Sequence, residues 1–214
     1  MSQLLHIDFS LRHEESVSRQ LTARYANRWK AAHPDGTVVY RDYGSEPVPH
    51  LSPAGAEVKF VPPADHTPAQ AAAYAIGTGL NADVAAADTV VLGVPLYNYG
   101  PPSAIKAWID NLVIGGVSHD PATQESLLGD TELVVLAVKG GAYGEGTPRE
   151  GWDHFEPWFS HVTSTIGLTP HYIRSEMTLA HTVPALFEFQ DIANASRTEA
   201  EAEIDALWTP EPVA

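Results

Sequence analysis

The chain has 214 residues, 44% of them hydrophobic and 18% charged, which is enough apolar sequence for one domain with a sizeable core. Its formal net charge of −15 argues against nucleic acid and anionic membranes as partners, because no basic stripe offsets the acidic residues. The sequence has no cysteine, which excludes disulfides, thiolate catalysis and cysteine metal sites.

Strand and helix patterns alternate along the chain. Apolar runs rich in β-branched residues predict strands at residues 3–9, 37–41, 89–94, 132–138 and 169–177. Apolar side chains at helical spacing predict helices at residues 17–33, 69–87, 105–112, 153–166 and 185–207. The Pro-rich stretch 43–68 is expected to be a long irregular connection.

This alternation predicts an α/β protein with a three-layer, doubly wound, flavodoxin-like fold, in which a five-stranded parallel sheet carries helices on both faces. No linker divides the chain, so we expect a single domain over residues 1–208 and a short tail over 209–214. The sequence shows neither a signal-peptide pattern nor a segment of membrane-spanning length. We therefore expect a cytoplasmic protein without a membrane partner.

Open sheets of this kind bind ligands at the carboxyl ends of their strands. The loop after the third strand is Pro95-Leu96-Tyr97-Asn98-Tyr99. Its rings and amide offer a flat apolar surface and hydrogen-bonding groups that suit a planar polar heterocycle. The alternative is an ordinary strand-to-helix turn whose aromatic side chains belong to the core.

The loop after the first strand, residues 10–18, carries the hydroxyls of Ser10, Ser16 and Ser18. It lacks the glycines of a dinucleotide fingerprint or a P-loop, but it leads into a helix whose N-terminus attracts anions such as phosphate. The alternative, which is the commoner arrangement, is that one serine is simply the N-cap. The two glutamates of this loop oppose an anion unless they point to solvent.

The loop after the fourth strand begins Val138-Lys139-Gly140-Gly141. Paired glycines let a backbone approach a ligand closely, and the Lys139 ammonium would stabilise negative charge on a reduced ring. The alternative is a flexible surface loop with a solvated lysine.

These three loops together resemble the FMN-dependent NADH azoreductases, a family also described as quinone reductases. The resemblance extends over nearly the whole chain, and the P-x-Y-N-[FY] element at residues 95–99 is its most specific part. The further matching segments are Ser10 with Ser16-Val17-Ser18, Arg41-Asp42, Lys106 with Trp108-Ile109-Asp110, Gly115-Gly116-Val117, Gly140-Gly141, Asp153 with Pro157-Trp158-Phe159, and Ile166-Gly167-Leu168.

The resemblance implies FMN as the cofactor, NADH or NADPH as the electron donor, and a quinone or aromatic azo compound as the substrate. It also implies a homodimer with two active sites at the subunit interface. The FMN phosphate would lie at the 10–18 loop and the isoalloxazine ring against the other two loops. The implied cofactor-binding residues are Ser10, Ser16, Val17, Ser18, Pro95, Leu96, Tyr97, Asn98, Tyr99, Val138, Lys139, Gly140 and Gly141.

Three positions depart from the family pattern, and residues 50–80 match it poorly. Val138 stands where the family often has a hydroxyl residue. Lys139 stands where the family usually has arginine. Lysine keeps the positive charge but lacks the planar guanidinium that can form two parallel hydrogen bonds. His119 stands where the family has an aromatic residue, which predicts a more polar substrate pocket. No side chain is an evident catalytic acid, and we expect Lys139, His119 and Tyr143 at most to assist chemistry that occurs on FMN.

The mechanism that this interpretation predicts is ping-pong, with NADH and the acceptor occupying the same place in turn. The main alternative is a flavodoxin-like FMN electron carrier without its own NADH-driven substrate reduction, for which an acidic surface is also typical. A second alternative is a flavodoxin-like domain that has lost its cofactor. No metal site is expected, because the histidines lack metal-ligand spacing.

Two further patterns predict packing rather than chemistry. The aromatic residues of the 152–159 segment are expected in the core, with part of them at a subunit interface. The alternating acidic residues between 199 and 205 are expected to form a solvated helix face.

Overall fold

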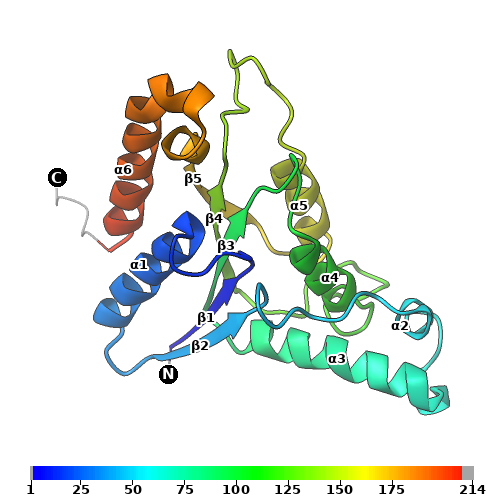
Figure 1. The fold of residues 1–214 in the computed structure, drawn as a ribbon. Helices are drawn as coiled ribbons and strands as arrows, with labels where there is room; N and C mark the ends of the chain where they lie inside the picture. Colours follow the sequence, from blue (N-terminus) through cyan, green and yellow to red (C-terminus); the bar gives the residue numbers. More distant parts are fainter. Residues whose placement is uncertain (1, 209–214) are drawn as a thin grey trace.

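The computed structural model describes residues 2–208, and its sheet consists of five parallel strands (Figure 1). Their spatial order is β2-β1-β3-β4-β5, so the direction of winding reverses between β1 and β3. This order confirms the predicted doubly wound, flavodoxin-like sheet, and it places the topological switch point at the carboxyl ends of β1 and β3. The strands are β1 (Gln3–Asp8), β2 (Thr37–Asp42), β3 (Thr89–Pro95), β4 (Glu132–Val138) and β5 (Pro170–Ser175).

Helices cover both faces of the sheet (Figure 1). One face carries α1 (Val17–Ala32) and α6 (Gln190–Ala206), and the other carries α3 (Pro68–Ala85), α4 (Ser103–Leu112) and α5 (Phe155–Ser164). None of the helices within residues 2–208 combines the length and apolar character that crossing a membrane requires.

The central strands divide their side chains between two apolar cores. In β1, Leu4 packs in the cluster under α1 and α6, whereas its neighbour Leu5 packs in the cluster under α3, α4 and α5. In β3, Val91 and Leu92 are divided in the same way. Successive strand residues point to opposite faces, so continuous apolar runs are what a sheet buried on both sides requires.

Two connections are more regular than the sequence indicates. The 43–68 stretch, expected to be irregular, contains the short helix α2 (Pro53–Glu57) and a 3-10 turn at Pro63–Asp65. The last helix begins at Gln190 instead of residue 185, because two 3-10 turns, Thr178–His181 and Pro184–Phe189, come first. Proline starts several of these short elements, since its fixed φ suits a first helical position.

The aromatic segment before and within α5 belongs mainly to the core. Phe155 and Phe159 are fully buried, and Trp158 packs against the same cluster. Trp152 is 47% exposed and lies outside the helix. Of the four large aromatic side chains in residues 152–159, Trp152 is thus the most exposed.

The acidic face expected on α6 is only partly solvated: Glu199 and Glu203 are exposed, whereas Glu201 and Asp205 are half-buried. Asp205 accepts hydrogen bonds from Arg24 at 2.6 Å and from Arg28 at 2.8 Å, which ties α6 to α1. These two guanidinium groups hold the pKa of Asp205 well below its usual value. The predicted tail, residues 209–214, lies outside the described residues.

The packing of α3 on α4 depends on a close approach at Gly77. A Cβ added to Gly77 would lie 2.6 Å from the Asn111 carbonyl oxygen, whereas one added to Gly79 would meet nothing within 4 Å. We expect Gly79→Ala to raise the free energy of unfolding by about 0.5–1 kcal/mol, because glycine is unfavourable inside a helix. Gly77→Ala should instead lower it by about 1–3 kcal/mol through overpacking.

Urea titration of the two variants measures this difference, with Gly79→Ala as the matched control. Equal stabilisation by both substitutions would contradict the close approach of the two helices.

Candidate active site

A cleft of about 570 Å³ opens at the carboxyl edge of the sheet, beside the switch point. The three loops singled out in the sequence all contribute to it. The predicted residues that line it are Ser10, Ser16, Val17, Ser18, Pro95, Leu96, Tyr97, Asn98, Val138 and Gly140. The structure thus brings most of the predicted cofactor-binding residues to one place.

The 10–18 loop presents buried hydroxyls at the N-terminus of α1. Ser16 is the N-cap, with its Oγ accepting the Arg19 N–H at 3.4 Å, and the Ser18 Oγ lies 3.2 Å from the Ser16 Oγ. Ser10, Ser16 and Ser18 are each almost fully buried and line the cleft. The capping role of Ser16 is therefore present, and it does not exclude an anion site, because these hydroxyls and the helix N-terminus face the same space.

The two glutamates of this loop, Glu14 and Glu15, place no unpaired buried charge beside the N-terminus of α1. Glu15 is largely exposed, and its carboxylate pairs with Arg12 at 2.8 Å. Glu14 is also exposed. Glu15 lines the cleft, but its charge is offset by Arg12, so neither glutamate leaves a buried, unpaired charge beside an anion in the loop.

Buried charges lie behind the loop, away from the cleft lining. Asp8 accepts hydrogen bonds from Thr22 at 2.8 Å and from Tyr40 at 3.0 Å. The pKa of Tyr40 is raised to about 12, mainly by burial and further by the charge of Asp8 and the hydrogen bond to it. The Tyr40 hydroxyl therefore stays protonated and donates to Asp8. Burial lowers the pKa of the Arg19 guanidinium, but Asp42 and Asp8 outweigh it and raise that pKa above its usual value.

The loop after β3 is a tight turn built on unusual backbone. Tyr97 and Gly100 exchange both backbone hydrogen bonds, at 3.0 and 3.1 Å. Asn98 and Tyr99 have φ of 52° and 67°, in the left-handed region that residues other than glycine seldom adopt. The hydroxyl of Tyr97 accepts the Leu11 N–H at 3.2 Å, which joins this turn to the first loop.

The left-handed turn also directs Tyr99 out of the cleft. Its ring lies 5.1 Å from the Trp152 ring and 5.9 Å from the Tyr143 ring, both edge-on. Tyr99 was expected among the cofactor-binding residues, but the structure places its side chain in this aromatic group. The ring of Tyr143, expected to assist proton delivery, lies there too and not in the cleft.

At the end of β4 the strand alternation decides which residues reach the cleft. Val138 and Gly140 line it, and Lys139 points the other way. A Cβ at Gly140 would lie 2.6 Å from the Leu179 Cδ1, so glycine lets Leu179 come close. Gly141 lies outside the lining, next to the Tyr143 hydroxyl.

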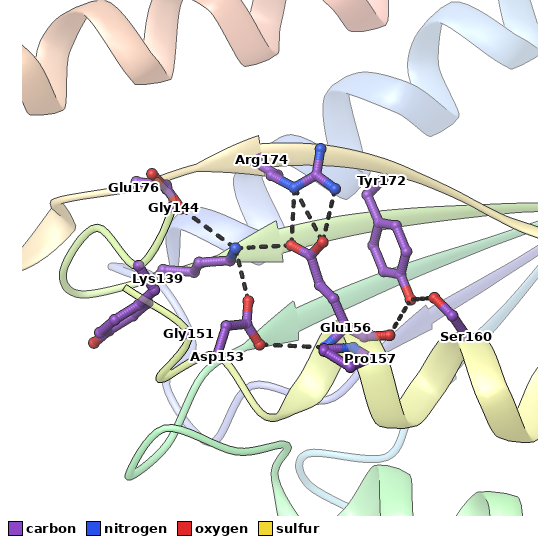
Figure 2. Close-up of a pocket in the computed structure, with 11 residues that line it drawn as sticks. Lys139, Gly144, Gly151, Asp153, Glu156, Pro157, Ser160, Tyr172, Arg174 and Glu176 are labelled. Atoms are coloured by element: carbon purple, nitrogen blue, oxygen red, sulfur yellow. Dashed lines mark hydrogen bonds and ion pairs between the residues drawn. The ribbon is translucent and has the colours of Figure 1, made fainter. Parts of the chain in front are cut away.

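Lys139 lies in a second, separate pocket of about 610 Å³ (Figure 2). Its buried ammonium lies 2.7 Å from Asp153, 2.8 Å from Glu156 and 3.3 Å from Glu176. Burial alone lowers the pKa of Lys139, but hydrogen bonds to Asp153 and Glu156 raise it above its usual value. Arg174 pairs with the same Glu156 at 2.7 Å.

The expected role of Lys139 beside a reduced ring therefore does not fit this geometry, because its charge is committed to three carboxylates outside the cleft. Lys139 and Asp153 stand at the two ends of the loop that projects above the sheet in Figure 1. Their ion pair closes the base of that loop.

His119 also lies outside the cleft lining, with its Nδ1 3.0 Å from the Ser118 hydroxyl. Within residues 2–208, no group of three or more His, Asp or Glu side chains could hold a metal ion.

Sequence reasoning missed the segment after β5, which forms one wall of the cleft through Thr178, Leu179, His181 and Thr182. The backbone N–H groups of Thr178 and Leu179 donate to Lys139 and Gly140 at 3.1 and 3.2 Å, which docks this wall onto the β4 loop. The predicted parallel sheet could have indicated this segment, because β5 runs parallel to β4 and its carboxyl end therefore lies at the same edge of the sheet. Arg12 and Glu15 were missed as well.

Comparison with known proteins gives consistent results. A family model described as a flavodoxin-like fold matches residues 2–206. The chain is 44% identical over 207 residues to an FMN-dependent NADH:quinone oxidoreductase of Frankia alni, covering 96% of this chain and 98% of that one. It is 40% identical over 208 residues to a protein of the same name from Streptomyces avermitilis, with 96% and 95% covered. Among solved structures, an azoreductase from Bacillus anthracis superposes with a TM-score of 0.80 at 26% identity, with 97% and 98% covered.

Removal of the Lys139 ammonium should expose how much the charge cluster contributes. We expect Lys139→Met to lower the free energy of unfolding by about 3–5 kcal/mol at pH 7, because three partly buried carboxylates lose the ammonium that they share and, in the described part of the chain, only Glu156 keeps another cation, Arg174. The raised folded-state pKa means that this contribution is complete below pH of about 10.4 and is lost as pH rises through the folded value. Denaturant titration at pH 7 therefore measures it in full.

Lys106→Met is the matched control, since Lys106 pairs with Asp110 on the exposed surface of α4. We expect that variant to lose no more than about 1 kcal/mol. Equal losses in the two variants would contradict the special position of Lys139.

Proposed function

The chain belongs to the flavodoxin-like fold family and, within it, to the FMN-dependent NADH:quinone oxidoreductases; on that premise we propose that it binds FMN in the cleft and transfers two electrons from NADH to quinones, azo compounds or both. The observation that carries the proposal is the cleft itself. It joins a hydroxyl-lined helix N-terminus to a wall that includes Pro95, Leu96 and Val138, at the switch point of the sheet.

The residues of the cleft fit FMN. Ser10, Ser16 and Ser18 would hold the terminal phosphate together with the N-terminus of α1. Residues 95–98 would hold the isoalloxazine ring together with the backbone at Gly140, where the absent Cβ lets Leu179 pack closely and form the adjoining wall. Bound FMN supplies the hydride and electron chemistry, and the protein supplies position and electrostatics.

Backbone donors are the best-placed groups to stabilise negative charge in the cleft, since Lys139 is directed elsewhere. The Tyr97 N–H is already donated to Gly100. We therefore assign this role to the backbone N–H groups of Asn98 and Gly140, which belong to residues that line the cleft.

We further propose that residues 1–208 act as one FMN-binding domain and that two copies pair as a homodimer. Support comes from exposed apolar side chains around the cleft mouth. Leu11 is 65% exposed beside Tyr97, and Leu179 is 44% exposed in the cleft wall. A second copy that covers them would complete the substrate site.

An assay of the purified protein tests the proposed function. We expect it to bind FMN and, with FMN bound, to oxidise NADH in the presence of benzoquinone without any added reductase. Gly140→Val should weaken FMN binding by about tenfold or more, because the new side chain displaces Leu179 into the cleft. Gly144→Val is the control, since a Cβ there meets nothing within 4 Å.

Fluorescence titration gives the FMN affinities, and absorbance at the NADH band gives the rate. Binding of FMN without NADH oxidation would favour the electron-carrier alternative, and a wild-type protein that binds no flavin would refute the proposal.

A ping-pong order is the kinetic expectation. The cleft is bounded by residues 96–98 on one side and by residues 178–182 on another, which leaves one place for a planar guest beside the ring. NADH would have to leave before a quinone could enter. Double-reciprocal plots against NADH at several quinone concentrations should give parallel lines, and intersecting lines would show that both substrates bind together.

A further inference from the structure

Arg19 belongs to the first turn of α1, but its side chain runs behind the 10–18 loop. Its Nε donates to the Arg12 carbonyl at 2.8 Å, and one terminal nitrogen donates to the Ser10 carbonyl at 2.7 Å. The same guanidinium donates to both carboxylate oxygens of Asp42, at 2.6 and 3.0 Å, and to the Tyr40 hydroxyl at 2.9 Å. All five guanidinium N–H groups therefore have partners.

This arrangement joins the first loop to β2. Asp42 is the last residue of β2, and Ser10 and Arg12 follow β1, so one planar group connects the ends of two neighbouring strands. The side chain of Arg19 is only 12% exposed. A bidentate guanidinium–carboxylate pair is geometrically specific, which makes Arg19 a rigid clamp on the loop.

The clamp also sets the direction of two carbonyl groups. The oxygens of Ser10 and Arg12 point at Arg19, which is not among the residues that line the cleft. Carbonyl oxygens that turned into the cleft would repel a phosphate. Because Arg19 holds both carbonyl groups, the groups of this loop that face the cleft are hydroxyls and backbone N–H groups.

The charge of Arg19 matters for the same reason. Asp8 is buried with its Oδ2 3.6 Å from the guanidinium, and Asp42 pairs with the same guanidinium at 2.6 Å. Without Arg19, two carboxylates would remain behind the loop and would oppose a dianion in front of it.

We infer that Arg19 is a positioning residue for the phosphate of FMN, which orients the 10–12 backbone and neutralises Asp8 and Asp42 behind it. The inference rests on the proposed function, because it assumes that FMN binds in this cleft. The contacts of its side chain are with the first loop, β1 and β2, and none of them is with residues 95–98 or 138–140. The effect of Arg19 should therefore fall on the phosphate and not on the ring.

The difference between FMN and riboflavin, which lacks the phosphate, tests this. Arg19→Met should weaken FMN binding by about tenfold or more while it changes riboflavin binding by less than about twofold. Arg19→Lys retains the positive charge but not the planar, bidentate guanidinium, and it should still weaken FMN binding at least about threefold. Fluorescence titration of the purified protein with each flavin measures both affinities.

Arg28→Met is the matched control, since it makes the same charge change on the same helix and leaves Arg24 paired with Asp205. It should change neither affinity by more than about twofold. If Arg19→Met does not fold, the Arg19→Lys protein carries the test.

Parallel losses of FMN and riboflavin, or an unchanged FMN affinity, would overturn the role of Arg19 while the proposed function stands. A wild-type protein that binds neither flavin would overturn both.

Discussion

The parallel pairing of the strands is the constraint on which the whole site depends. Asp8 of β1 is paired with Gly93 of β3, and Pro95 of β3 is paired with Val138 of β4. Since every strand runs in the same direction, the loops that follow them leave from one edge of the sheet. Segments far apart in sequence thereby become walls of one cleft, and no side chain has to reach across the molecule to build it.

Buried ion pairs hold these loops from behind. On the β2 side, Arg19 is bound by Asp42 and the loop carbonyls. On the β5 side, Lys139 is held by Asp153 and Glu156 at the base of the projecting loop. Both cations are directed away from the cleft lining, so they shape the backbone around it and leave the recognition of an anion to hydroxyls and helix N–H groups. Taking these charges out of water has a desolvation cost, which the close pairing and hydrogen bonds offset.

The order of elements was predictable because it depends on local pattern. Apolar runs of strand length and helical repeats are short-range signals, and β4 matches its predicted bounds at Glu132–Val138. The 3-10 turns at residues 178–189 were not predictable in the same way, since their short sequences carry no helical repeat. The pairing of Asp205 with α1 depends on a helix far away in sequence, so an acidic run alone could not reveal it.

For the site, the sequence by itself determined the fold family, the three loops and the small residues that let a backbone come close. Only the tertiary structure decided which way their side chains point. Tyr99 leaves the cleft because two successive residues adopt left-handed φ, and Lys139 leaves it because strand neighbours face opposite sides. It also decided that the segment after β5 completes the wall, because the hydrogen bonds that dock Thr178 and Leu179 onto the β4 loop join residues far apart in sequence.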